Sequence, residues 1–509
     1  MELRFIADTG RGNLNESDRK AIRSHVMKGK NLGRWRSLGS RPRQEQLKQL
    51  KQLEHRHGHV SSSSSDSSRN TSSPNSDASQ ASSSHPLDLT TSRDLPILLD
   101  VPRKLGSAAS IMSLADSVEP EIFDIVLRFS AIAKQLLFSI ETCIFFDRRV
   151  ENWVAPLAVD AAFLHSNISV SVYYYDVVLS RTPSRASQRT WYYHHSKTLH
   201  LLRDRLGSNN TDIQLSDSTV SVILSLAGQA FCAGDLKTAT KHMEGIHRII
   251  ELRGGFDTFN GNEKLATEVI RCDLGMAIHS GTKSLLFTTS IHCAWPYPPL
   301  SLFLDKNMRN PNADNYQFPH LTELAGIPHD NQLTSAWNTM SDFCSIINLA
   351  AVSNQRITVD LFLRSMASVM YRLINMQFEP SSVSEIIRLG LLCFCCGVFL
   401  QWQRLGTSYP QLASSVKNIF VRLNVMGLLM PQRLALWLLM VGSVSVLTDS
   451  DSDWIQPQLR HAAASLELQS WNQVRKVLSE FMWIDMVHGK AGKRVFEAAL
   501  PVHQDGLTV

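Results

Sequence analysis

Charged residues and cysteine are both scarce in this sequence of 509 residues. Asp, Glu, Lys and Arg make up 19% of the chain, and cysteine occurs only eight times. So few cysteines in so long a chain exclude a small secreted scaffold held together by disulfides. The low charged fraction excludes a chain that is mainly disordered, and a hydrophobic fraction of 43% is enough to bury a large core. The length exceeds that of one ordinary domain.

Long apolar runs are also missing. The first residues, MELRFIADTGRGNLN, lack the apolar core of a signal peptide, so we do not expect secretion. The longest apolar runs, Leu389–Leu400 and Leu434–Leu447, are shorter than the roughly 20 residues that cross a bilayer. Both are predicted to be buried core helices. We therefore expect no membrane partner and a reducing compartment, the cytosol or the nucleus.

Motifs for catalysis or metal binding are absent as well. No nucleophile elbow, zinc-protease motif or phosphate loop occurs, and Gly489–Lys493 has the wrong glycine spacing for a phosphate loop. Cys393, Cys395 and Cys396 are predicted to be free core cysteines, because adjacent helical positions point apart. The pairs His194-His195 and His292-Cys293 are isolated in the sequence. We therefore predict no enzyme, no cofactor and no metal site.

An acidic run near the C-terminus needs separate mention. Asp449, Asp451 and Asp453 alternate as at the start of a calcium loop, but Trp454 stands where such a loop needs glycine. We interpret the run as a solvated acidic loop. His242 and His247 fall on a strongly amphipathic helical segment and are interpreted as packing or polar-face residues.

Positive charge is concentrated in the first 60 residues. This arm holds 14 Lys and Arg against 6 Asp and Glu, while the remaining residues hold 37 against 40. A basic run of this kind is typical of a nuclear import signal, of phosphate contacts with nucleic acid, or of a solvated tail, and the sequence leaves these open. The candidate residues for import or nucleic-acid contact are Arg19, Lys20, Arg23, Lys28, Lys30, Arg34, Arg36, Arg41 and Arg43.

The composition changes twice after the arm. Residues 61–118 begin with a stretch, 61–84, in which 14 of 24 residues are serine, and they are predicted to be a disordered linker. Residues 119–500 are predicted to be an all-α body, a large helical bundle or array, with a proline-rich loop at 292–330 between two helical halves. The predicted helices cover about 120–137, 157–179, 187–206, 216–233, 235–252, 265–280, 333–350, 359–376, 382–403, 411–426, 431–447, 454–467 and 470–488.

Segments of the arm and the body occur in an order found in one family. The segments are Ile22–Met27, Trp153–Pro156, Asp160–His165, Tyr192–Leu206, Gly234–Leu236, His242–Ile246, Leu252–Gly255, Trp437–Gly442, Ser470–Val474 and Phe481–Asp485. Together they resemble the fungal-specific transcription factor domain, over about 120–500 plus the arm. The most specific part is His-x-x-Gly at His242, followed by Leu-Arg-Gly-Gly at Leu252.

The resemblance implies a regulatory helical domain in a nuclear transcriptional regulator, acting on metabolic or secondary-metabolite genes. Its implied partners are promoter DNA, bound directly or through another protein, and the transcription machinery, with a homodimer or heterodimer left open. Many members of that family read DNA with a six-cysteine binuclear zinc cluster near the N-terminus. The first cysteine here is Cys143, so we expect no such cluster.

Two other functions remain as alternatives. One is a co-regulator or adaptor that acts through a DNA-binding partner, which the missing N-terminal cysteines favour. The other is an enzyme or small-molecule sensor with a pocket between helices, for which Trp191, Tyr192, Trp402 and Trp437 are candidate lining residues. Core packing is the interpretation we favour for these four aromatics.

Overall fold

The computed structural model describes residues 113–137, 139–145, 153–180, 184–259, 261–286, 295–303, 331–353, 355–426 and 430–500. The chain divides into two units, Met1–Ser62 and Ser63–Val509, and every described residue belongs to the second. The predicted arm and most of the predicted linker lie outside the described residues. The described part is mostly helical, which confirms the all-α prediction for the body.

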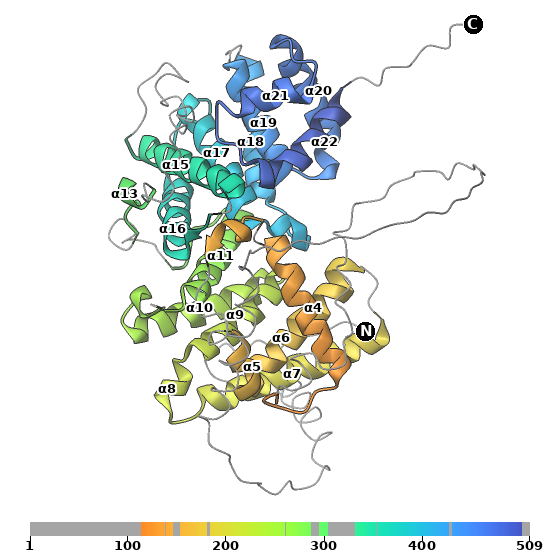
Figure 1. Ribbon diagram of the computed structural model, residues 1–509, viewed down its shortest axis with the longest axis vertical. Helices are drawn as coiled ribbons and strands as arrows, with labels where there is room; N and C mark the ends of the chain where they lie inside the picture. Colours follow the sequence, from red (N-terminus) through yellow and green to blue (C-terminus); the bar gives the residue numbers. More distant parts are fainter. Residues whose placement is uncertain are drawn as a thin grey trace, which may run out of the picture. The chain divides into compact units, whose positions relative to one another are not determined.

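The first group of elements runs from the start of the body to the proline-rich segment (Figure 1). Its members, with their bounds, are α4 (Pro120–Leu137), η1 (Glu141–Cys143), β1 (Ile144–Phe145), α5 (Ala155–Val159), α6 (Ala161–Tyr173), η3 (Tyr174–Leu179), α7 (Arg185–Leu206), α8 (Thr211–Gln214), α9 (Asp217–Cys232), α10 (Leu236–Arg253), η4 (Phe256–Phe259) and α11 (Glu263–Ser280). Helix α6 packs against α4, α7 and α9, and α9 also packs against α10. The N-terminal half is thus built around α6 and α9.

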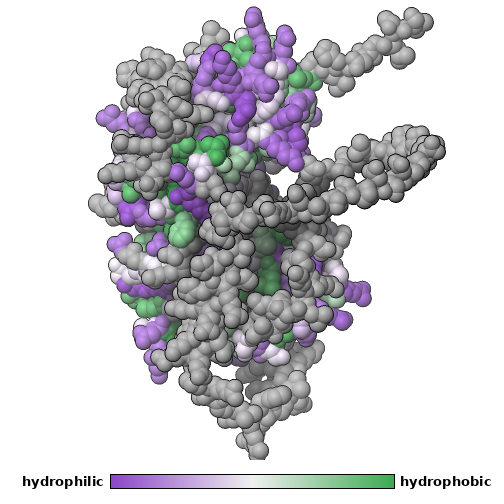
Figure 2. Space-filling view, in the orientation of Figure 1, coloured by the Kyte–Doolittle hydropathy of each residue, from purple (hydrophilic) through white to green (hydrophobic). Residues whose placement is uncertain are grey.

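The second group completes the body, with α19 packed against α17, α20 and α22. Its members are α13 (Leu300–Phe303), α15 (Asn331–Ser353), β2 (Ile357–Thr358), α16 (Val359–Asn375), α17 (Val383–Cys395), η7 (Cys396–Leu400), η8 (Trp402–Leu405), α18 (Pro410–Met426), α19 (Gln432–Ser445), η9 (Asp449–Asp451), α20 (Ser452–Ser465), α21 (Trp471–Leu478), η10 (Asp485–Gly489) and α22 (Lys490–Ala499). In the view of Figure 2, hydrophilic side chains dominate the surface over α20, α21 and α22.

A two-residue parallel pairing joins the groups. Ile144 of β1 pairs with Ile357 of β2, and Phe145 pairs with Thr358. Helix α11 joins them more extensively, because it contacts α9 of the first group and α16 and α18 of the second. Every residue of α11 from Leu265 to Ile278 is buried except Glu268. The two predicted halves therefore share a single core, which extends from Phe123 to Ala499.

Polar side chains fix the ends of the helices where the sequence signals them. Asp160 caps α6 by accepting a hydrogen bond from the Phe163 backbone N–H at 3.0 Å. The predicted continuous helix at 157–179 is therefore wrong, because the extended backbone of Asp160 separates α5 from α6 and the last turn, η3, is π-helical. Helix α10 ends at Arg253, and Gly254 follows with a φ of 95°, the left-handed region that favours glycine. The C-terminal end of the predicted helix at 235–252 is therefore confirmed to within one residue.

The two apolar runs are buried core helices, as predicted. Leu389–Leu400 lies in α17 and η7, and Leu434–Leu447 lies mainly in α19, with nearly every side chain buried. By length and composition alone, the segments Thr211–Cys232 and Val383–Leu400 would be able to cross a membrane. Such segments also occur as core helices of soluble proteins, so they are weak evidence for a membrane.

The predicted helix at 470–488 is wrong. Helix α21 ends at Leu478, residues 481–484 are non-helical and buried, and α22, which the periodicity missed, begins at Lys490. Side chains from other helices supply the donors that buried backbone outside a helix requires. Trp437 Nε1 donates to the Met482 carbonyl at 2.9 Å, and Asn348 Nδ2 donates to the Trp483 carbonyl at 2.9 Å.

The predicted helix at 382–403 is wrong at its C-terminal end. The chain changes from α to π geometry at Cys396, and Gln401 then adopts a φ of 53°. A left-handed conformation is unusual for a residue other than glycine, and the surrounding contacts must hold it. Gln401 Oε1 accepts a hydrogen bond from Ser139 Oγ at 2.7 Å. This turn directs the next residue, Trp402, toward the first group of helices.

Candidate ligand pocket

The nine basic residues predicted for import or nucleic-acid contact, Arg19 to Arg43, lie outside the described residues, as does His292-Cys293. The aromatic candidates can be placed. Trp402 lines a pocket, whereas Trp437 is fully buried in the core, stacked on Phe481 with ring centroids 5.7 Å apart. The core interpretation is therefore right for Trp437 and wrong for Tyr192, whose exposed fraction is 41%.

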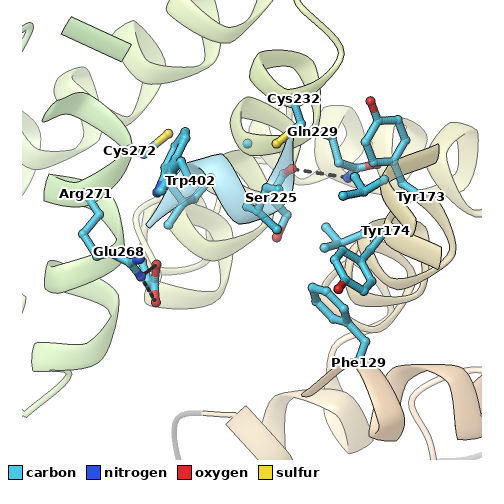
Figure 3. Close-up of a pocket in the computed structure, with 15 residues that line it drawn as sticks. Phe129, Tyr173, Tyr174, Ser225, Gln229, Cys232, Glu268, Arg271, Cys272 and Trp402 are labelled. Carbon is cyan, nitrogen blue, oxygen red and sulfur yellow. Dashed lines mark hydrogen bonds and ion pairs between the residues drawn. The ribbon is translucent and has the colours of Figure 1, made fainter. Parts of the chain in front are cut away.

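The pocket has a volume of about 250 Å³ and lies between elements that are distant in sequence (Figure 3). Helix α9 contributes one face of its surface, Leu224, Ser225, Gly228, Gln229 and Cys232. The other lining residues come from α4, α6, η3, α11 and η8. The spacing along α9 follows the helical repeat, so these side chains lie on one side of the helix.

Aromatic rings form much of the wall. Phe129 of α4 packs against Tyr174 with ring centroids 5.1 Å apart. Trp402 packs against Phe231 at 4.8 Å, and its ring lies over Gly275, whose absent Cβ would be 3.4 Å from the indole. Two irregular turns place these rings, since Tyr174 begins the π-helical turn η3 and Trp402 follows the left-handed Gln401. π-Helical turns within α-helices occur frequently at functional sites.

Hydrogen bonds fix the orientation of the Gln229 side-chain amide. Its Oε1 accepts hydrogen bonds from Ser169 Oγ at 2.8 Å and from Trp191 Nε1 at 3.1 Å. Its Nε2 donates to the Ser225 carbonyl at 3.3 Å, the bond drawn in Figure 3. Trp191 therefore supports the pocket from behind Gln229 and does not line it.

One edge of the pocket carries an ion pair. Arg271 Nη1 lies 3.1 Å from Glu268 Oε2, and both residues come from α11. Arg271 also donates from Nε to the Phe399 carbonyl at 2.7 Å and from Nη2 to the Leu400 carbonyl at 2.8 Å. The guanidinium is thus committed to the end of η7, and its charge is balanced by Glu268.

The other titratable groups of the lining are neutral at pH 7. Burial raises the pKa of Tyr173 and of Tyr174 to about 12. Burial likewise raises the pKa of the Cys232 and Cys272 thiols. These phenols and thiols therefore keep their protons, and the pocket presents an apolar wall with balanced charge.

A second cluster of polar groups was missed by the sequence analysis. His194, which is isolated in the sequence, lies against His165 of α6 with their Nδ1 atoms 2.7 Å apart. His165 Nε2 lies 3.2 Å from Asp116 Oδ2, and Lys197 forms an ion pair with the same carboxylate. Because Asp116 accepts, His165 must donate from Nε2, so we assign the shared Nδ1–Nδ1 proton to His194.

The protonation states in this cluster follow from burial and hydrogen bonding. Burial and the neighbouring His165 lower the pKa of His194 to about 4. Burial alone would raise the pKa of Asp116, but hydrogen bonds from Lys197 and His165 outweigh it and lower that pKa to about 2. The cluster is therefore a neutral histidine pair next to an ion pair.

The remaining predicted site residues lie in the core or at a helical cap. Cys393, Cys395 and Cys396 are free and buried in the core, as predicted. Asp451 caps a helical turn with Thr448 and forms an ion pair with Lys417 at 2.7 Å, so the middle of the acidic run is a structured cap and not a solvated loop. Within the described residues, no group of three His, Cys, Asp or Glu side chains has an arrangement that would hold a metal ion.

In the segment Gly489–Lys493, which lacks the glycine spacing of a phosphate loop, one glycine has a packing role. Gly492 lies on α22 where Trp483 packs so closely that a Cβ would be 2.7 Å from its ring.

Comparison with known proteins adds no assignment to the site. No protein-family model, curated protein or solved structure matches this chain.

Proposed function

We propose that the chain is a nuclear transcriptional regulator of the fungal type, in which the helical body is the regulatory part and the basic arm provides the electrostatic contact. In this proposal the chain is not an enzyme. It controls a set of metabolic or secondary-metabolite genes, and it reaches promoter DNA directly or through a partner.

The observation that carries the proposal is the ordered set of segments resembling the fungal-specific transcription factor domain. Several of these segments occupy positions that hold the helical body together. Asp160 caps α6 and bonds Arg205 of α7 at 2.5 Å. Arg253 bonds the Leu215 carbonyl at 2.6 Å and Asp217 at 2.9 Å.

The distribution of charge supports the same function. The first 60 residues have a net charge of +8, from 14 basic and 6 acidic residues, whereas the rest of the chain has 37 basic and 40 acidic residues. A separate basic arm attracts phosphate backbones or the import machinery, and the folded body need not supply any of this positive charge.

Transcript profiling after deletion of the gene tests the proposal. We expect a coherent set of genes, enriched in one metabolic or biosynthetic pathway, to change. A transcriptome that stays the same under the conditions in which the gene is expressed would refute the regulator function.

A co-regulator that binds DNA only through a partner is the second candidate. It is favoured by the position of the first cysteine, Cys143, far from the N-terminal region where the zinc cluster of such regulators is found. Gel shift of the purified full chain at increasing salt separates the two candidates, because direct phosphate contacts weaken with salt. Binding to one promoter that survives competitor DNA would exclude the co-regulator.

A matched pair of variants assigns any DNA binding to the arm. The first replaces Arg34, Arg36 and Arg41 by alanine. The control replaces three exposed basic residues of the body, Lys241, Arg248 and Lys493, with side-chain exposures of 69%, 67% and 55%. We expect the arm variant to lose affinity and to have a smaller salt dependence, while the control binds as the unmodified chain does.

A further inference from the structure

We propose that the pocket between α9, α11, η3 and η8 binds an uncharged, mainly apolar small molecule about the size of a two-ring aromatic compound. This inference goes beyond the proposed function, because it concerns a ligand and stands whether or not the chain binds DNA.

The size of the ligand follows from the size of the space. The pocket volume is about 250 Å³. An apolar cavity of about 150 Å³ holds benzene. The additional space admits a second ring. The pocket is smaller than the pockets of about 300–1,000 Å³ that hold drug-sized molecules.

The absence of charge on the ligand follows from the lining. Glu268 is paired with Arg271, whose other donors are bonded to the carbonyls of Phe399 and Leu400. The tyrosines and cysteines of the lining are neutral, as shown above. A charged ligand would lose its hydration without gaining an opposite charge, which costs several kcal/mol or more. A neutral apolar ligand gains contact with the aromatic wall and loses little.

The walls are held in place before any ligand arrives. Ser169 and Trp191 fix the Gln229 amide, and Gly275 and Phe231 fix the Trp402 ring. Binding to a preformed site avoids the cost of ordering side chains. The pocket is therefore rigid, as a ligand site is, and differs in this from a loosely packed defect.

Gly228 gives direct access to the pocket by mutation. It lies inside α9 and lines the pocket, and a Cβ built on it meets no atom within 4 Å. A larger side chain at 228 would therefore extend into the empty space without a clash. Gly245, inside α10, offers a matched control, since its Cβ also meets nothing within 4 Å and it does not line the pocket.

The experiment measures binding of 2-naphthol to the full-length chain by ligand-observed NMR titration. We expect saturable binding at one site, at least tenfold weaker binding to Gly228→Leu, and unchanged binding to Gly245→Leu. Both variants should melt at or above the temperature of the unmodified chain, because leucine is a better helix former than glycine. The charge of the ligand is tested with 2-naphthalenesulfonate, which has the same rings and should bind at least tenfold more weakly than 2-naphthol.

Three results would overturn the inference. They are no saturable binding of 2-naphthol, equal binding to Gly228→Leu and the unmodified chain, and equal loss in both leucine variants. Equal affinity for the sulfonate would overturn the assignment of an uncharged ligand. None of these measurements involves DNA or transcription, so their failure is distinguishable from failure of the proposed function.

Discussion

At the residue scale, one close contact determines which residue type fits at several positions. Gly390 of α17 is the clearest, because a Cβ there would lie 2.3 Å from Cζ3 of Trp437. Trp437 is fully buried and bonded to the Met482 carbonyl, so its ring has no room to move away. Glycine at 390 is therefore what permits α17 and α19 to approach each other.

We expect Gly390→Ala to lower the free energy of unfolding by about 1–3 kcal/mol, because it overpacks the contact with Trp437. Urea denaturation followed by circular dichroism measures the change. The control is Gly245→Ala, which meets no atom within 4 Å and should be neutral or stabilising by up to about 1 kcal/mol. Equal stability of the two variants would contradict the packing argument.

Acid should destabilise the folded chain through His194. The pKa of this side chain is lowered from 6.5 to about 4 by burial and by His165. Between these values the unfolded chain binds a proton that the folded chain does not, so stability falls as the pH drops from about 6.5 to about 4. The slope from this group is at most about 1.4 kcal/mol per pH unit.

Chemical denaturation at a series of pH values tests this expectation. His194→Gln should have a shallower dependence than the unmodified chain over this interval. His200→Gln serves as the control, because His200 lies on the same helix with a side-chain exposure of 61%. A slope that His194→Gln leaves unchanged would remove His194 as the source.

At the scale of elements, one carboxylate organises three helices. Asp160 caps α6, pairs with Arg205 of α7 and accepts from Ser218 of α9, both at 2.5 Å. The side chains of Asp160 and Arg205 are only 14% and 12% exposed. Burial by itself would raise the pKa of Asp160, but bonds from Arg205 and Ser218 lower it, so the carboxylate stays charged. The local helix signal and the tertiary contact thus reside in the same residue.

We expect Asp160→Ala to lower the free energy of unfolding by about 3–5 kcal/mol, because it leaves Arg205 nearly buried without its partner. Asp160→Asn keeps the cap to Phe163 and should cost about 1 kcal/mol less. Asn210→Ala, which removes the exposed cap of α8, should cost only about 1 kcal/mol. An Asp160→Ala loss no larger than that of Asn210→Ala would mean that the ion pair adds nothing.

At the scale of the whole molecule, the two helical halves are held by one core. Arg271 of α11 bonds the carbonyls of Phe399 and Leu400, and Asp273 accepts a hydrogen bond from Tyr371 of α16 at 2.9 Å. These bonds join residues about 100 or more positions apart. Helix α11 therefore couples segments on both sides of the proline-rich region at 292–330.

We expect the described body to unfold in a single cooperative transition. Far-ultraviolet circular dichroism, which reports all helices, and tryptophan fluorescence should give the same midpoint in urea. Arg271→Leu should lower that midpoint for both signals, since it breaks the link from α11 to η7. Two separate transitions in the unmodified chain would show that the halves fold independently.

Local patterns were sufficient for much of the fold. Helical content and the burial of Leu389–Leu400 and Leu434–Leu447 follow from periodicity, and the glycine cap at Gly254 follows from residue type. Each of these signals lies within a few residues of the feature it predicts. The charge difference between arm and body is a matter of counting. The sequence by itself therefore determined an all-α body and the boundaries of most of its helices.

Tertiary structure alone decided where these helices meet and what lies between them. The buried non-helical segment 481–484 depends on donors from Trp437 and Asn348, and the histidine pair joins residues 29 positions apart. The pocket forms only where side chains of α9, α11 and η8 converge. The one weak sign of it in the sequence is on α9, where Gly228 stands among apolar residues. Such features arise from contacts between distant segments, and no local propensity or periodicity encodes them.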